Sequence, residues 1–338
     1  MTNITKVKLD KGTIPTKDTK LVLANGALSV PPLSVGTWQW GDTRVWGWVL
    51  EDEKGAKDAF DKAFELGIPF YNTAEVYGDG ESEREICRFK QSYTKEQQDQ
   101  VIVATTYYTH RDRTGFPQVL LSNLRDSLAR LGTFNVDLYQ IHSPVHIDSI
   151  EVVADALADA YDAGLIKTVG VSNYGLEEVK RMHAALERRS ISLASNQVSY
   201  SLIRNIPEKS GLIQLCHDLG VAILAYSPIG MGLLTGKYNA SGPFPERRDK
   251  LFSSLETEQL RRLLQVVKTT SEKYNVPQSA IALNWCIVKG TIPLGGARTG
   301  IQMEQNVLAL GFRLADEDVD ALDQFAFLGA NSKEWQHG

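Results

Sequence analysis

Short apolar runs alternate with longer amphipathic stretches along the chain from Leu33 onward. Each short run is bounded by turn residues, as is typical of a buried strand, whereas the longer stretches repeat their apolar residues with the period of a helix. In Gln118–Leu131, for example, one apolar stripe contains Leu120, Leu124, Leu128 and Leu131. Eight strands are predicted, over Leu33–Thr37, Phe70–Thr73, Val101–Thr105, Val136–Ile141, Ile166–Val171, Leu193–Val198, Val221–Ala225 and Thr291–Pro293.

Helices are predicted between these strands, over Asp52–Leu66, Gln118–Leu131, Ile150–Ala163, Leu176–Arg188, Glu208–Leu219 and Thr257–Tyr274. Strand–helix units that repeat without a proline- or glycine-rich linker favour a closed barrel over a doubly wound sheet with a second domain. We therefore expect an α/β protein with a (β/α)8 TIM barrel over about residues 33–314, inside a single domain that covers residues 1–338.

Three segments lie outside this repeat. Strand-like pieces at Lys6–Leu9 and Lys20–Ala24, with a turn at Asn25-Gly26, predict an N-terminal β-hairpin that covers the closed end of the barrel. The segment Gly230–Leu255 is rich in Gly, Pro, Ser and Arg, and a loop of that length is usually functional or mobile. Asp316–Phe327 predicts an extra C-terminal helix.

Composition and charge narrow the class of protein. Hydrophobic residues make up 43% of the 338 residues, enough for a large core. Lys and Arg total 36 against 41 Asp and Glu, and this net charge of −5 argues against a nucleic-acid partner. The three cysteines are far apart, and no apolar run approaches the roughly 18 residues that span a membrane. We therefore expect a cytoplasmic monomer or homo-oligomer with no membrane partner.

Barrel enzymes place their chemistry at the carboxyl ends of the strands. In this chain the residues at all eight predicted ends are polar or aromatic, although a single such residue is more often a turn or a helix cap. Taken together they indicate a solvated mouth that holds a large polar ligand. These residues are Gly36–Trp40, Asn72–Tyr77, Thr105–Tyr108, Gln140–His142, Ser172–Tyr174, Asn196–Gln197, Tyr226–Pro228 and Gly295–Arg298.

Several of these stretches form long motifs in a fixed order. They are Gly36-Thr37-Trp38-Gln39-Trp40-Gly41, Asn72-Thr73-Ala74-Glu75-Val76-Tyr77-Gly78, Asp137-Leu138-Tyr139-Gln140-Ile141-His142, Gly170-Val171-Ser172-Asn173-Tyr174, Ser195-Asn196-Gln197-Val198 and Ala225-Tyr226-Ser227-Pro228. With them, the chain from about Leu33 to Leu314 resembles an aldo-keto reductase, and most of all the plant and fungal branch of pyridoxal reductase-like proteins. The resemblance implies a barrel that binds NADP(H) at its mouth and reduces carbonyl groups with a Tyr, Lys, Asp and His tetrad.

Two members of that tetrad are replaced in this sequence. Tyr77 matches the catalytic acid and His142 the histidine that orients the carbonyl oxygen, but Asn72 stands in place of the aspartate and Thr106 in place of the lysine. The family's ammonium lowers the cost of forming tyrosinate, whose unperturbed pKa is about 10. Losing both charges together avoids a stranded buried charge, so the paired replacement is structurally tolerable.

This replacement leaves two functions open. In the first, the protein is an NADP(H)-dependent oxidoreductase that reduces a carbonyl, conjugated carbonyl or imine needing little acid help. In the second, Tyr77 and His142 transfer protons in a non-redox isomerase, dehydratase or cyclase, with the nucleotide as a structural ligand. A third hypothesis, a cofactor-sensing protein without catalysis, is weaker than both.

The resemblance also implies the cofactor contacts. The nicotinamide carboxamide is expected on Ser172, Asn173 and Gln197, with the Tyr226 ring stacked on the nicotinamide. The pyrophosphate is expected along Ser227, Pro228, Ile229, Gly230, Gly232, Leu233 and Lys237. Arg298 matches the cation that binds the 2′-phosphate, which favours NADP(H) over NAD(H), and Gln302 and Asn306 are placed to reach the adenine. Further cofactor contacts are assigned to Gly36, Thr37, Trp38, Asn72 and Gly296.

The substrate side of the mouth is expected to be aromatic. Trp38, Trp40, Tyr107 and Tyr108 are assigned to it, and such a lining suits a flat or bulky hydrophobic small molecule. His146 follows His142 by four residues, but no carboxylate or cysteine arrangement supports a metal, so no metal site is predicted.

Overall fold

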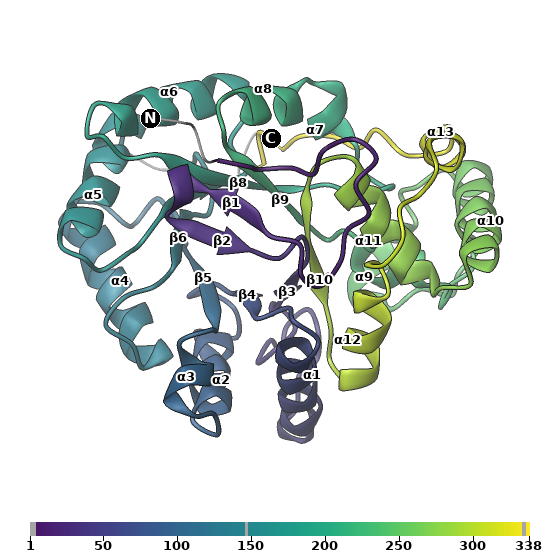
Figure 1. The fold of residues 1–338 in the computed structure, drawn as a ribbon, viewed down its shortest axis with the longest axis horizontal. Coiled ribbons are helices and arrows are strands. Elements are labelled where there is room, and N and C mark those ends of the chain that lie inside the picture. The colour runs from purple at the N-terminus through teal and green to yellow at the C-terminus, as the bar shows by residue number, and fades with distance from the viewer. Residues whose placement is uncertain (1–4, 146–147, 333–335) are drawn as a thin grey trace.

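The computed structural model describes residues 5–145, 148–332 and 336–338. Eight parallel strands close into a barrel in the order β10-β3-β4-β5-β6-β7-β8-β9, and helices surround it (Figure 1). The predicted (β/α)8 barrel is confirmed, and each predicted strand is present with bounds shifted by a few residues. The strands are β3 (Ser34–Gly36), β4 (Phe70–Asn72), β5 (Ile102–Tyr107), β6 (Leu138–Ile141), β7 (Val169–Ser172), β8 (Leu193–Ser199), β9 (Ala222–Tyr226) and β10 (Ile292–Gly296).

The helices follow the strands around the barrel. The stretch predicted as one helix over Glu208–Leu219 is split in two, because Gly211 adopts a left-handed φ of 83° between them. No helix within the described ranges is long and apolar enough to cross a membrane. The α-helices are α1 (Glu53–Glu65), α2 (Glu81–Lys90), α3 (Lys95–Gln98), α4 (Gln118–Leu131), α5 (Ile150–Asp162), α6 (Leu176–Glu187), α7 (Ile206–Lys209), α8 (Leu212–Asp218), α9 (Glu246–Phe252), α10 (Thr257–Tyr274), α11 (Gln278–Val288), α12 (Gly300–Val307) and α13 (Asp316–Asp323).

An antiparallel hairpin crosses the amino end of the barrel, drawn in purple in Figure 1. Its strands are β1 (Leu21–Leu23) and β2 (Leu28–Val30), joined through the short 3-10 helix η1 (Ala24–Gly26). The predicted hairpin and its turn are present, but Lys6–Leu9 is not the partner strand: Lys6 makes only a single bridge to Val22. The left-handed turn at Asn25 instead returns the chain directly to β2. Apolar residues of both hairpin strands pack into the barrel interior and close this end.

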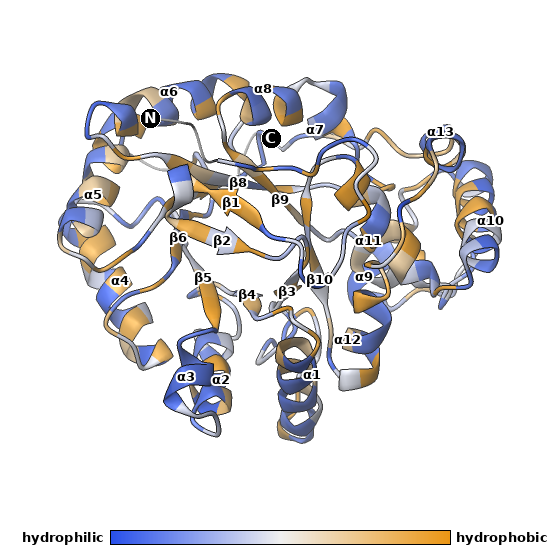
Figure 2. Ribbon diagram, in the orientation of Figure 1, coloured by the Kyte–Doolittle hydropathy of each residue, from blue (hydrophilic) through white to orange (hydrophobic). Residues whose placement is uncertain are grey.

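The main core lies between the barrel and its helices. Strands such as β5 and β9 are largely apolar, and most helices turn a mixed or polar face outward (Figure 2). An exception is α11, which is buried from Ser279 to Ile287. Because a helix buried on all sides carries no amphipathic period, the hydrophobic pattern does not reveal it.

The long segment after β9 reaches across the carboxyl end of the barrel. It contains the 3-10 helix η3 (Gly230–Thr235) and α9. From α9, Arg247 donates to the carbonyl of Thr43, and Arg248 donates to the carbonyl of Met231 at 2.7 Å. The Arg248 guanidinium also lies 5.0 Å from the centre of the Trp46 ring. The loops after β9 and β3 are therefore joined over the mouth of the barrel.

Candidate active site

A large cavity opens at the carboxyl ends of the strands, with a volume of about 1230 Å³. Small-molecule sites usually measure roughly 300–1,000 Å³, so this cavity has room for a large ligand and a smaller one beside it. Among the residues that the structure describes, no Asp or Glu lines it. Residues predicted for the site that line it are Gly36, Thr37, Trp38, Asn72, Tyr77, Tyr108, His142, Ser172, Asn173, Gln197, Tyr226, Ser227, Pro228, Ile229, Gly232, Lys237, Gly296, Arg298, Gln302 and Asn306.

Tyr77 and His142 both line the cavity, and both are uncharged near neutral pH. Burial raises the pKa of Tyr77 to about 12. Burial lowers the pKa of His142 to about 4. The Tyr77 ring stacks on Trp38 at 6.1 Å between ring centres, and the Tyr108 ring meets that of His142 edge-on at 5.4 Å. The site therefore offers a phenolic O–H donor and a neutral imidazole between aromatic rings.

Asn72 and Thr106 belong to a chain of uncharged polar groups. The Gln140 amide donates to the Oδ1 of Asn72 at 3.2 Å and to the hydroxyl of Thr106 at 3.3 Å. The Gln197 amide donates to the same Asn72 oxygen at 2.9 Å. Asn72 and Thr106 are 2% and 3% exposed, so these hydrogen bonds satisfy groups that have almost no access to water.

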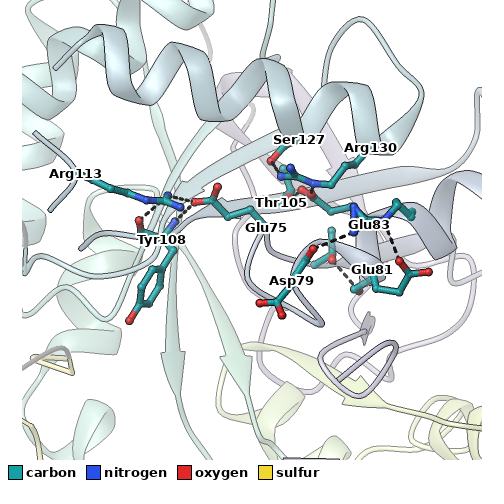
Figure 3. Close-up of polar contacts among 12 residues, drawn as sticks. Glu75, Asp79, Glu81, Glu83, Thr105, Tyr108, Arg113, Ser127 and Arg130 are labelled. Atoms are coloured by element: carbon teal, nitrogen blue, oxygen red, sulfur yellow. Dashed lines mark hydrogen bonds and ion pairs between the residues drawn. The ribbon is translucent and has the colours of Figure 1, made fainter. Parts of the chain in front are cut away.

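Two buried carboxylates, Glu75 and Glu83, join the segment that follows β4 to neighbouring segments of the chain (Figure 3). Glu75 pairs with Arg113 and accepts the backbone N–H of Tyr108 at 2.6 Å, which fixes the loop after β5. Glu83, at the start of α2, accepts from the hydroxyl of Thr105 and pairs with Arg130 at 2.6 Å. Both carboxylates are paired with an arginine and neither lines the cavity, so they support the site without bringing charge into it.

Side chains at the ends of β7, β8 and β9 form one hydrogen-bonded group. The Ser172 hydroxyl donates to the carbonyl of Gln197 at 2.8 Å, and the Asn173 amide donates to the carbonyl of His142 at 2.8 Å. The Tyr226 hydroxyl donates to the Oδ1 of Asn173 at 3.0 Å. The four residues expected around a nicotinamide are therefore neighbours in the structure.

The backbone after β9 has the form expected of a phosphate cradle. Ser227, Met231 and Gly232 have left-handed φ values of 53°, 53° and 97°. Turns of this kind make concave surfaces lined by backbone N–H groups, which bind anions. Lys237 and Arg248 line the cavity alongside them. These residues fit the pyrophosphate of a dinucleotide.

The other end of the cavity is formed by Arg298 and α12. The Gln302 side chain accepts the backbone N–H of Arg298 at 2.7 Å, and the Asn306 amide donates to the carbonyl of Gly296 at 3.1 Å. Arg298 itself pairs with Asp52 at 2.7 Å. The residues expected to bind the adenosine end of NADP(H) thus lie together, with one partner, Asp52, that the sequence analysis did not single out.

Five predicted site residues lie outside the cavity lining. Trp40 is fully buried and donates its indole N–H to the carbonyl of Ala297 at 2.9 Å, so it belongs to the core and not to the substrate side. Tyr107 is 1% exposed, because side chains of a strand alternate and its neighbour Tyr108 takes the inward direction. The others are Thr106, Gly230 and Leu233, which lie beneath the surface.

His146 is a candidate metal ligand in the sequence, although no metal site is predicted there. His146 lies outside the described residues. No group of three metal-binding side chains occurs in the ranges that the structure describes.

Gln336, near the C-terminus, donates to the Tyr226 hydroxyl at 2.6 Å, and the backbone N–H groups of His337 and Gly338 donate to the carbonyl of Asn173. Sequence reasoning missed this contact, since no motif links the last residues to β9.

Comparison with known proteins agrees with this arrangement. The profile of the Aldo/keto reductase family matches residues 32–326. The chain is 35% identical over 302 residues to the chloroplastic pyridoxal reductase of Arabidopsis thaliana, covering 87% of this chain and 82% of that protein. It is 29% identical over 315 residues to the L-glyceraldehyde 3-phosphate reductase of Escherichia coli O157:H7, covering 88% and 89%. Among solved structures, the glycerol dehydrogenase of Gluconobacter oxydans superimposes with a TM-score of 0.77 at 26% identity, covering 98% of this chain and 99% of that one.

Proposed function

Because the chain belongs to the aldo/keto reductase family, a family of oxidoreductases that use a nicotinamide cofactor, we propose that it is an NADP(H)-dependent reductase with an altered catalytic tetrad. Its substrate is a hydrophobic or aromatic small molecule with a carbonyl, a conjugated carbonyl or an imine. The observation that carries the proposal is one cavity lined by the uncharged Tyr77 and His142 together with Asn72, whose hydrogen bonds through Gln140 to Thr106 are also between uncharged groups. Relatives named for the reduction of pyridoxal and of L-glyceraldehyde 3-phosphate support a carbonyl substrate.

The cavity residues fit NADP(H). Ser172, Asn173 and Gln197 would hold the carboxamide and Tyr226 the ring, while the backbone after Ser227 would hold the pyrophosphate. Arg298 would bind the 2′-phosphate, for which a planar guanidinium is well suited. When bound, NADPH supplies a hydride to the electrophilic carbon of the substrate.

Tyr77 and His142 then orient the substrate. The Tyr77 hydroxyl donates a hydrogen bond to the oxygen or nitrogen of the substrate. The neutral His142 imidazole orients the same atom. Since the pKa of Tyr77 is raised to about 12, complete proton transfer to a developing alkoxide costs more here than beside an ammonium group. An iminium ion needs no such proton, because hydride addition already gives a neutral amine. A conjugated carbonyl spreads the developing negative charge over several atoms and therefore needs less proton donation.

The aromatic rings define the substrate side. Trp38, Trp46 and Tyr108 line the cavity next to Tyr77 and His142, and Trp38 and Trp46 meet edge-on at 5.7 Å between ring centres. Flat apolar molecules gain both buried area and ring contacts in such a pocket. This lining supports the choice of a hydrophobic or aromatic substrate.

The test is a fluorescence titration with NADPH, followed by an absorbance assay at about 340 nm with aromatic aldehydes, conjugated ketones and cyclic imines. We expect tight NADPH binding and oxidation of NADPH by the imines or conjugated ketones. Tyr77→Phe should bind NADPH normally, because the hydroxyl acts on the substrate. Tight binding with turnover but no change at 340 nm would favour the isomerase, dehydratase or cyclase. Absence of NADPH binding would refute the proposal.

A further inference from the structure

The guanidinium of Arg298 is already engaged by an acidic side chain. Its Nη2 donates to the Oδ2 of Asp52 at 2.7 Å, and its Nη1 donates to the carbonyl of Trp46 at 3.4 Å. Arg298 and Asp52 are 34% and 28% exposed at their side chains, so water screens the pair only in part. The positive charge offered to a ligand at this end of the cavity is therefore largely compensated.

The position of Asp52 is fixed by the local fold. Asp52 ends the 3-10 helix η2 (Leu50–Asp52) directly before α1, and its Oδ2 also accepts the backbone N–H of Val49 at 3.1 Å. Helix α1 packs closely against α12, the helix that follows Arg298. Asp52 and Arg298 thus lie at the starts of two helices that contact each other, so the packing of these helices fixes the ion pair.

A carboxylate in this position affects NADPH and NADH differently. The 2′-phosphate of NADPH carries nearly two negative charges at neutral pH, which are attracted by Arg298 and repelled by Asp52. NADH has a neutral hydroxyl there and does not experience either effect strongly. Asp52 therefore lowers the advantage that Arg298 gives to NADPH, while leaving the affinity for NADH almost unchanged.

We propose that Asp52 is a specificity-determining residue. Through its ion pair with Arg298, Asp52 reduces the ratio of the affinity for NADPH to the affinity for NADH, so that NADH can compete for the site. The proposal rests on the proposed function, because it concerns the same cofactor site. It names the side chain that sets the balance between the two cofactors. Asp52 acts through Arg298, since Asp52 itself is not among the residues that line the cavity.

The experiment compares Asp52→Asn with Glu51→Gln in binding titrations with NADPH and NADH. Glu51 is the exposed neighbour of Asp52, so its variant removes one negative charge from the same turn without removing the ion pair. We expect Asp52→Asn to bind NADPH about tenfold more tightly and NADH within about twofold of the wild type, a difference that shrinks in high salt. Glu51→Gln should change the ratio of the two affinities by less than about twofold.

Fragments separate the 2′-phosphate from the rest of the cofactor. In calorimetric titrations, adenosine 2′,5′-bisphosphate should gain affinity in Asp52→Asn, whereas adenosine 5′-monophosphate should not. In an Arg298→Met background, Asp52→Asn should improve the binding of the bisphosphate less than in the wild type, because only the direct repulsion by Asp52 is removed and no guanidinium is released from the pair.

The outcomes distinguish this inference from the proposed function. If the wild type binds neither NADPH nor NADH, the cofactor assignment itself fails. If it binds both but Asp52→Asn changes their ratio no more than Glu51→Gln does, or weakens NADPH binding because Arg298 has lost its anchor, the role given to Asp52 is wrong. Both titrations measure binding alone and require no substrate.

Discussion

Under the proposed function, the absence of charge at Asn72 and Thr106 limits how strong an acid Tyr77 can be. A carboxylate and an ammonium at these two positions would form a buried ion pair beside the phenol, and a cation within about 4–6 Å lowers the pKa of a tyrosine by roughly 1–3 units. The structure has a neutral amide and a neutral hydroxyl there, joined through Gln140. Burial consequently acts on Tyr77 without opposition and raises its pKa to about 12.

Restoring the two charges should restore acid catalysis. We expect Asn72→Asp combined with Thr106→Lys to reduce a simple aromatic aldehyde at least about tenfold faster at pH 7 than the wild type, because a lower pKa of Tyr77 makes proton transfer easier. The wild type should show rates independent of pH between about 6 and 9, since His142 titrates near 4 and Tyr77 near 12. The double variant should instead lose activity as the pH rises through the lowered pKa of Tyr77. Steady-state kinetics across this range measures both effects.

The controls separate charge from damage to the fold. Asn72→Asp alone buries an uncompensated carboxylate and should lower stability by several kcal/mol, on the order of 3–5. Tyr77→Phe in the double variant should remove the gain. A double variant that binds NADPH and still reduces no small aldehyde would show that the pocket, and not the tetrad, limits the reaction.

At the scale of elements, the C-terminal segment supports the end of β9. Gln336 donates to the Tyr226 hydroxyl at 2.6 Å, while that hydroxyl donates to Asn173 at 3.0 Å. Arg204 binds the same C-terminal segment by donating to the carbonyl of Gly338 at 2.8 Å. The ring expected to stack on the nicotinamide is therefore held from a segment 110 residues later in the chain.

Loss of this contact should weaken cofactor binding more than folding. We expect Gln336→Ala to reduce NADPH affinity by about threefold to tenfold, since a hydrogen bond of this kind contributes about 0.5–1.5 kcal/mol. In a Tyr226→Phe background the same substitution should have no further effect, because the hydroxyl that Gln336 binds is gone. Fluorescence titrations of the wild type, the two single variants and the double variant form a double-mutant cycle that measures this dependence. Additive losses would show that Gln336 acts elsewhere.

The elements themselves were predictable to different degrees. All eight barrel strands follow from short apolar runs between turns, and α4 and α10 have the predicted bounds, because each buries one face. Helix α11 has no such pattern, since it is buried all around. The hairpin was predicted, but its second strand was not, because a left-handed turn at Asn25 decides which segment pairs with β1.

At the scale of the whole molecule, the candidate site was predictable where a motif carries it and not where distant segments meet. Strand ends and motifs point to Tyr77, His142 and Asn173, which all line the cavity. No local pattern pairs Asp52 with Arg298, which lie 246 residues apart and meet only once the barrel closes. Trp40 is buried and lies outside the cavity lining, since a strand-end position alone does not tell the cavity side from the core side.

One buried carboxyl on α2 makes a contribution to the stability of the whole molecule that depends on pH. Glu85, on α2, is 1% exposed, and its Oε2 has no hydrogen-bond partner among the described residues. Burial raises the pKa of Glu85 from 4.5 to about 7, although Arg88 lies 2.8 Å away and opposes the change. Between these two values the folded protein keeps a proton that the unfolded chain has lost. The contribution of Glu85 to the free energy of unfolding therefore falls as the pH rises from about 4.5 through about 7.

Replacing this carboxyl should remove that contribution, which is measured as the difference in stability between the variant and the wild type. We expect Glu85→Gln to be more stable than the wild type at pH 8, by up to about 3 kcal/mol, and close to it at pH 5, because the glutamine never pays the cost of ionising in the core. Urea unfolding at the two pH values measures the difference. Glu177→Gln, at an exposed position of α6 paired with Lys180, should leave the pH dependence unchanged. A Glu85→Gln variant that loses stability equally at both pH values would mean that the ion pair with Arg88 outweighs the burial of the carboxylate.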